Sequence, residues 1–111
     1  MDISHVDFHE GVMQNAAATT VDGTPLDMRS KRYVTLQVIG SFTGTVTWKA
    51  SLDDGTTYGD VQAVPLATGT AATTATAAGI YRIGPIMCDK ILADITAISN
   101  GAITVIGRAS A

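Results

Sequence analysis

The stretch that decides the fold is residues 33–51, which read YVTLQVIGSFTGTVTWKAS. In its first half the apolar residues Val34, Leu36 and Val38 alternate with Tyr33, Thr35 and Gln37. This is the period-two pattern of a strand with one buried face. In its second half small and β-branched residues alternate around Trp48, which we expect in the core with an acceptor for its indole N–H. The pattern predicts two strands, Arg32–Ile39 and Thr45–Ser51, paired as an antiparallel hairpin.

Residues 91–108 show the same alternation on either side of Asn100-Gly101. A two-residue loop would pair Ile95 with Ile106, whereas a three-residue loop with Gly101 in the left-handed position pairs Ile95 with Val105. We expect the second register, because it places the apolar residues of both strands on one inner face. That inner face comprises Ile91, Ala93, Ile95, Ile103 and Val105. The outer face then carries Leu92, Ile98 and Ile106, more apolar surface than a lone monomer normally shows to water.

The remaining strands are expected to be shorter. A first strand is predicted around 12–17 and another at 80–83. A weaker strand is predicted around 61–66, at an edge or with a bulge, because Pro65 cannot donate to a ladder. Residues 67–79 are almost wholly Ala, Thr and Gly and fit either a long loop or an irregular edge strand. No segment predicts a helix of three turns.

Together these patterns predict an all-β protein. We expect a single antiparallel β-sandwich, jelly-roll-like, of about seven to eight short strands over residues 12–111. Residues 1–11 are polar and acidic and are expected to form an N-terminal arm that either packs on a neighbouring molecule or stays partly ordered.

Composition narrows the classes of function. At 111 residues the chain fits one domain, and its charged fraction of 15% is low. A net charge of −3 without a clustered basic face argues against a nucleic-acid partner. No apolar stretch is long enough to span a membrane, and no signal peptide precedes the domain, so we expect synthesis in the cytoplasm. Cys88 lies in an apolar run and is expected to be a core residue.

Candidate chemical groups are few. His5 and His9 fall outside the predicted sandwich, so no base lies near a nucleophile. We therefore expect no enzyme activity, catalytic residues, cofactor or small-molecule substrate. The turn carboxylates Asp53, Asp54 and Asp60 lack the spacing of a calcium loop, and we expect no metal site.

Several motifs, in this order, resemble a recurrent domain of tailed-bacteriophage virion structural proteins. They are GTPLDM at 23–28, YVTLQV at 33–38, GTVTWKASLDDG at 44–55, AGIYR at 78–82, GAITV at 101–105 and RAS at 108–110. The resemblance runs from around residue 15 to the end of the chain. It implies a small β-sandwich used repetitively in capsid decoration, neck or tail-fibre positions, and it carries over no catalytic residues.

The expected function is that of a non-enzymatic virion protein. We expect a capsid decoration (cement) protein that forms a homotrimer and binds the major capsid protein or other virion proteins. The contact residues would be Leu92, Ile98 and Ile106, with His5 and Phe8 of the arm. One alternative is a neck, tail or fibre component. Another is a glycan-binding module, which would expose Tyr58 or Tyr81 beside polar groups.

Overall fold

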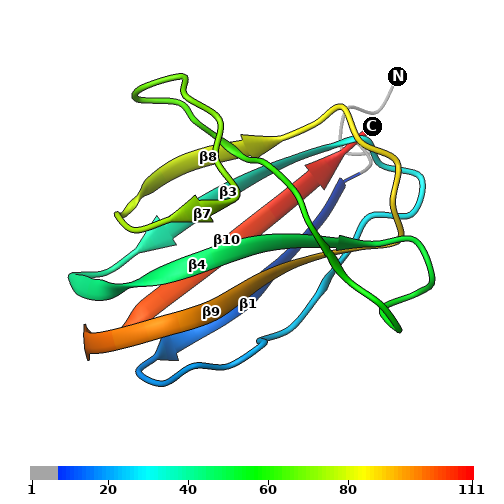
Figure 1. Cartoon of the computed structure of the whole chain (residues 1–111). Helices are drawn as coiled ribbons and strands as arrows, with labels where there is room; N and C mark the ends of the chain where they lie inside the picture. Colours follow the sequence, from blue (N-terminus) through cyan, green and yellow to red (C-terminus); the bar gives the residue numbers. More distant parts are fainter. Residues whose placement is uncertain (1–7) are drawn as a thin grey trace.

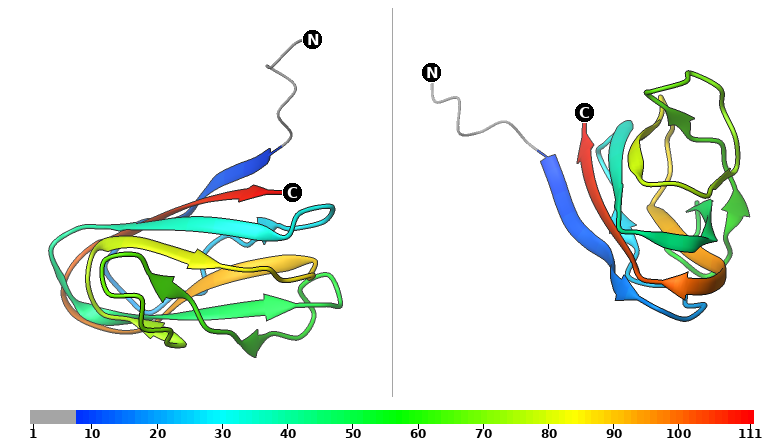
Figure 2. Two further views of the ribbon diagram at one scale, coloured as in Figure 1. Left: turned by 90° about the horizontal axis from the view of Figure 1, so that it is seen from above. Right: turned by 90° about the vertical axis from the view of Figure 1, so that its left-hand side faces the viewer.

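The computed structural model describes residues 8–111, which form two antiparallel sheets packed face to face (Figures 1 and 2). Sheet A has the order β1-β10-β3-β8-β6, with β1 at Phe8–Ala17, β10 at Ile103–Ser110, β3 at Tyr33–Ile39, β8 at Gly79–Ile83 and β6 at Val64–Pro65. Sheet B has the order β2-β9-β4-β5, with β2 at Leu26–Asp27, β9 at Lys90–Gly101, β4 at Phe42–Ser51 and β5 at Gly59–Asp60. A further short strand, β7 at Thr74–Ala75, pairs with β4. The predicted all-β sandwich is confirmed, with ten strands.

The sandwich begins earlier than the sequence suggested. β1 starts at Phe8 and pairs with β10 from that residue onward. Residues 8–11, which we assigned to an arm, are therefore part of sheet A. Across 8–111, no helix is long and apolar enough to cross a membrane.

The core lies between the inner faces of the two sheets. Trp48 is fully buried at its centre and packs against Tyr81, with ring centroids 5.5 Å apart. The indole nitrogen of Trp48 has no hydrogen-bond partner among the described residues, so the acceptor we expected for it is missing there. Cys88 is buried, as predicted.

Both predicted hairpins are wrong. β3 lies in sheet A between β10 and β8, whereas β4 lies in sheet B beside β9. β9 and β10 are likewise in opposite sheets, so Ile95 pairs with Val46 and Val105 pairs with Val38. The burial prediction nevertheless holds, because the inner residues of β9 and β10 face each other across the core. Each turn therefore carries the chain from one sheet to the other.

Two of these crossings lie against each other at one end of the sandwich (Figure 1). Gly40 and Gly101 both have positive φ, +131° and +79°. A Cβ on Gly40 would lie 2.3 Å from the Ala102 oxygen, and one on Gly101 would lie 2.1 Å from the Ser41 oxygen. Each crossing thus occupies the space that a side chain on the other would need, which requires glycine at both positions.

At the edge of sheet A, Gln14 joins the two sheets. Its side chain is 3% exposed, and its Nε2 donates to the Val21 oxygen at 3.0 Å and to the Ala93 oxygen at 2.8 Å. The β1–β10 register shifts on either side of Gln14, which turns this polar residue inward. The amide thus satisfies one carbonyl of β9 and one at Val21, in a segment that bridges to Ile95 of β9.

Candidate interaction surfaces

The outer face of sheet A carries a row of exposed apolar side chains. The ladder register aligns Val12, Ile106, Gln37 and Ile80 across four strands. The three apolar members are 50%, 37% and 38% exposed in the order Val12, Ile106, Ile80. Ile39 lies opposite Thr104 at the next outward-facing position of β3 and is also exposed. Aligned apolar residues on a sheet face are typical of contact surfaces.

A row of polar and charged residues borders the apolar row on this face. Glu10, Arg108, Thr35 and Arg82 align across the same four strands. The guanidinium of Arg108 donates from Nη2 and Nε to Glu10 Oε2 at 2.8 and 3.1 Å. Apolar residues beside a polar border are the usual anatomy of a protein interface.

The outer face of sheet B is polar. Lys49 Nζ lies 3.0 Å from Asp94 Oδ2, and this bond raises the pKa of Lys49 above its ordinary value. The hydroxyl groups of Thr47 and Thr96 lie 3.0 Å apart on the same face. These side chains bond to one another across β4 and β9.

The structure separates the residues that we expected to form one contact face. Ile106 is exposed in sheet A, but Ile98 is half-buried in sheet B. Leu92 is only 5% exposed, so its predicted place on an exposed outer face is wrong. Ile106 lies apart from Ile98 and Leu92 because β10 and β9 belong to different sheets. His5 lies outside the described residues, and Phe8 is described only through its backbone pairing in β1.

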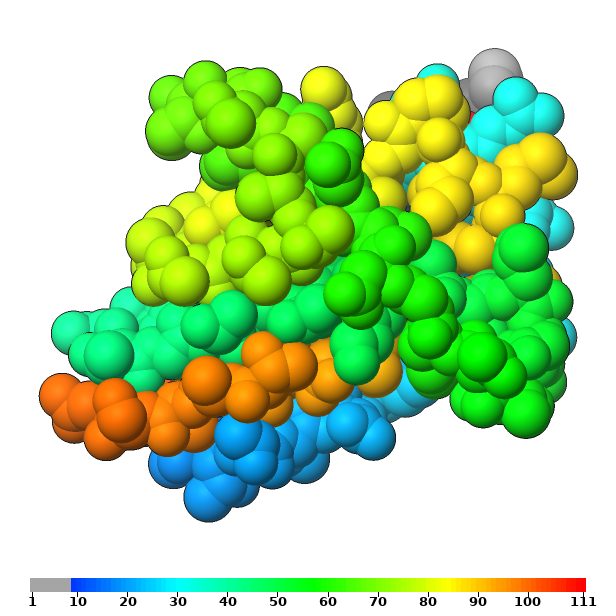
Figure 3. All heavy atoms as spheres, viewed as in Figure 1, coloured from blue at the N-terminus to red at the C-terminus, as the bar shows by residue number. Residues whose placement is uncertain are grey.

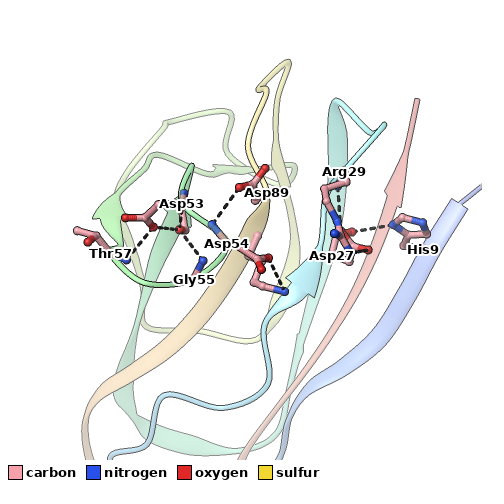
Figure 4. A network of polar contacts seen from close by, with 10 residues as sticks. His9, Asp27, Arg29, Asp53, Asp54, Gly55, Thr57 and Asp89 are labelled. Carbon is pink, nitrogen blue, oxygen red and sulfur yellow. Dashed lines mark hydrogen bonds and ion pairs between the residues drawn. The ribbon is translucent and has the colours of Figure 1, made fainter.

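Loops from three parts of the chain are tied together at one end of the sandwich, the loop end (Figure 4). Asp89 is the central residue: its N–H donates to the Ser51 oxygen, its carbonyl accepts from Met28 N, and its carboxylate accepts from Asp54 N. These three bonds measure 2.8, 2.8 and 2.9 Å. They fix the loops around residues 28, 54 and 89 relative to one another.

The turn after β4 is stabilised by its own side chains. Ser51 Oγ donates to Asp53 Oδ1 at 2.7 Å and accepts from Gly55 N at 2.9 Å. Asp53 Oδ1 also accepts from Thr57 N at 2.8 Å. The bond from Ser51 holds the pKa of Asp53 below its ordinary value. This carboxylate is thus committed to the turn.

A second carboxylate is held by a neighbouring arginine. Arg29 donates from Nε and Nη2 to Asp27 at 3.1 and 3.2 Å, which lowers the pKa of Asp27 to about 2. The Asp27 carbonyl lies 2.8 Å from His9 Nδ1. Within residues 8–111, no group of three or more His, Cys, Asp or Glu side chains is placed to hold a metal ion.

Trp48, Tyr58 and Tyr81 do not form the exposed aromatic face that a glycan-binding module would need. Trp48 is fully buried, and Tyr81 is 7% exposed with its hydroxyl donating to the Ala77 oxygen. Tyr58 is half-buried, and its hydroxyl is inaccessible to solvent. A glycan-binding face would need exposed rings, which these residues do not offer.

Sequence reasoning missed two sets of surface residues. Val12 and Ile80 join Ile106 only through the strand order, which alternation along the chain does not reveal. Leu52 and Met87 are exposed in loops at the loop end. A signal for Leu52 was present, because it is a large apolar residue inside an otherwise polar turn, SLDDG.

The architecture is that of a small two-sheet module with exposed apolar side chains on one outer sheet face and at the loop end. Residues 7–109 match the XepA family, and the chain belongs to that family. No curated protein matches the chain.

Two solved structures share this fold. The SPBc2 prophage-derived protein YomS superposes with a TM-score of 0.84 at 16% identity, covering 95% of this chain and 94% of YomS. The PBSX exported protein XepA superposes with a TM-score of 0.89 at 17% identity, covering 100% of this chain but 40% of XepA. The chain therefore spans less than half the length of XepA.

Proposed function

We propose that the chain is a non-enzymatic structural component of a bacteriophage particle that associates with copies of itself. Membership of the XepA family supports a phage origin, as does a fold shared with a prophage-derived protein and with a PBSX exported protein. Within this proposal the chain acts without cofactor or small-molecule substrate and binds neither nucleic acid nor membrane.

The observation that carries the proposal is the apolar row on sheet A. Val12, Ile106 and Ile80 are all more than a third exposed and lie in one row of the same sheet face, with Gln37 between Ile106 and Ile80. Burying such a row against another molecule would release its hydration water, the main favourable term in association. The polar and charged row beside it would define the border of the contact.

Within the particle we favour a capsid decoration (cement) role. The chain would form a homotrimer and bind the major capsid protein, after synthesis in the host cytoplasm. A neck or tail-fibre position is the alternative. Labelling the chain with an antibody and imaging particles by electron microscopy separates these positions, because signal over the shell supports decoration and signal at the neck or tail contradicts it.

The association itself is tested by Ile106→Asp. A charge in the centre of the row should shift the wild-type oligomer towards smaller species, measured by size-exclusion chromatography with light scattering. Thr43→Asp is the matched control, because Thr43 is an exposed strand residue of sheet B. A wild-type chain that is monomeric at high concentration, or an oligomer that Ile106→Asp leaves unchanged, would contradict association through this face.

A further inference from the structure

Strand β9 ends in the sequence Asn100-Gly101, where the chain crosses from sheet B to sheet A. Asn100 is exposed, and its side-chain amide makes no hydrogen bond to any of residues 8–111. Gly101 is the last residue of the strand and has a φ of +79°. Figure 3 shows this end of β9 (orange) at the surface, beside the start of β4 (blue-green). An uncommitted amide therefore stands in solvent next to a residue without a side chain.

An asparagine amide in this setting can react with the backbone that follows it. The nitrogen of the next residue loses its proton and attacks the side-chain carbonyl carbon Cγ. A C–N bond forms, and the amide nitrogen leaves as ammonia with the proton that the backbone gave up. The product is a succinimide ring, which water opens at either carbonyl. Cleavage of the Cγ–N bond leaves aspartate, whereas cleavage of the original peptide bond leaves isoaspartate.

Two properties of Gly101 favour attack by its nitrogen. It has no Cβ, so no side chain shields this nitrogen from Cγ of Asn100. It also ends the β4–β9 ladder, in which Asn100 pairs with Thr43 just beyond a register shift. The ring can close only when the Asn100 backbone rotates out of its extended conformation, and the ends of ladders open most readily. The reaction is therefore expected in the folded protein, through opening of this last pair.

The other asparagine of the chain is held differently. Asn15 is also exposed, but the residue that follows it is Ala16, whose nitrogen donates to Thr104 Oγ1 at 3.0 Å. This hydrogen bond must break before the nitrogen can attack, and the methyl group of Ala16 hinders the approach. Together these two effects should slow the attack by roughly tenfold or more. Asn15 therefore serves as an internal reference for Asn100.

We propose that Asn100 is a site of spontaneous deamidation, converted to isoaspartate and aspartate by attack of the Gly101 nitrogen. The overall reaction consumes one water molecule, releases ammonia and needs no enzyme. It replaces a neutral amide by a carboxylate and so adds one negative charge to a chain whose net charge is −3. This modification does not depend on the proposed association through sheet A.

Isoaspartate at this position should loosen the contact between the two crossings. Its backbone runs through Cβ and Cγ, so it is one methylene group longer than the backbone of asparagine. The crossing is tight here, because a Cβ on Gly101 would lie 2.1 Å from the Ser41 oxygen and 2.8 Å from Phe42 Cα. The isoaspartyl form should therefore melt at a lower temperature than the unmodified protein. Aspartate keeps the normal backbone and adds only a charge.

The test is incubation of the folded protein in mildly alkaline buffer, followed by trypsin digestion and mass spectrometry. Cleavage after Lys90 and Arg108 releases residues 91–108, in which Asn100 is the only side-chain amide, while Asn15 lies in another peptide. We expect deamidation at Asn100 to be roughly tenfold or more faster than at Asn15. It should also accelerate as the pH rises, because the attacking nitrogen must lose its proton. Protein isoaspartyl methyltransferase, which labels isoaspartate, distinguishes the two products.

Asn100→Gln is the matched control, and its peptide should stay unmodified because the longer side chain closes a ring much more slowly. Two results would overturn the proposal. One is an Asn100 that stays intact in the folded protein while it reacts in the urea-unfolded chain, and the other is an equal rate at Asn15. Ion-exchange chromatography isolates the isoaspartyl form for thermal melting, with Asn100→Asp as the control for charge alone. Equal melting temperatures for these two forms would contradict the loosening of the crossings.

Discussion

The two outer faces of the sandwich are built from similar strands but differ in chemistry. On sheet B, Lys49 bonds to Asp94 and Thr47 to Thr96, so the polar groups satisfy one another. On sheet A, the row through Ile106 leaves apolar side chains more than a third exposed. Both sheets bury the same kind of apolar inner face. Folding therefore constrains the inner faces of both sheets, whereas the chemistry of the outer faces is free to differ.

The largest loss of stability should come from removing the core that both sheets share. Trp48→Ala should lower the free energy of unfolding by about 3–5 kcal/mol, because it leaves a large cavity between the sheets. Trp48→Phe should cost less, since the indole nitrogen has no described partner to lose. Urea denaturation measures both. Equal losses in the two variants would contradict the view that cavity size sets the cost.

A second test compares a glutamine inside the sandwich with one on the outer face. Gln14→Leu should destabilise the fold by about 1–3 kcal/mol, because it leaves the buried Ala93 oxygen without its donor. Gln37→Leu should change stability by less than about 0.5 kcal/mol, since the side chain is exposed. It should instead strengthen self-association, because it makes the apolar row continuous. Similar stability losses at both positions, measured by urea denaturation, would contradict the bridging role of Gln14.

The smallest effects should come from the ion pairs on the two faces. A double-mutant cycle on Lys49 and Asp94 should give a coupling of about 1 kcal/mol, because these side chains are only 27% and 13% exposed. The Arg108–Glu10 pair, 65% and 51% exposed, should give roughly 0–0.5 kcal/mol. Reversal of this order would mean that burial does not govern the difference.

The Lys49–Asp94 pair also predicts a pH dependence. The folded-state pKa of Lys49 is raised above 10.5. The contribution of Lys49 to stability is therefore fully present below pH 10.5 and is lost as the pH rises through the higher folded-state value. Asp94→Asn should flatten this part of the stability curve.

Strand positions and buried faces could be predicted from the sequence, but the pairing of strands could not. Alternation in 33–39 places Val34, Leu36 and Val38 inward, and all three are buried. The same alternation would be seen if the next strand paired with this one in the same sheet or lay in the opposite sheet across the core. Gly40 and Gly101 look like hairpin signals, yet their positive φ serves crossings between sheets.

The candidate interaction surfaces could be predicted only in part, because which residues lie side by side depends on the pairing of the strands. Ile106 was predicted to be exposed and is, but Leu92 was placed beside it through a hairpin that does not form. The loop end was not predicted because its residues come from three distant segments that hydrogen bonds bring together. Contacts between distant segments leave no periodic trace in the sequence.

The place of β10 within sheet A has a consequence for synthesis of the chain. β10 lies between β1 and β3 and pairs with both. β1 and β3 are translated earlier, but they are not joined in the sheet until residues 103–110 have been made. A nascent chain held on the ribosome before that point lacks the strand that joins β1 to β3 in sheet A. The chain therefore folds after translation of β10, and a ribosome stalled before residue 103 would hold a chain that proteases digest readily.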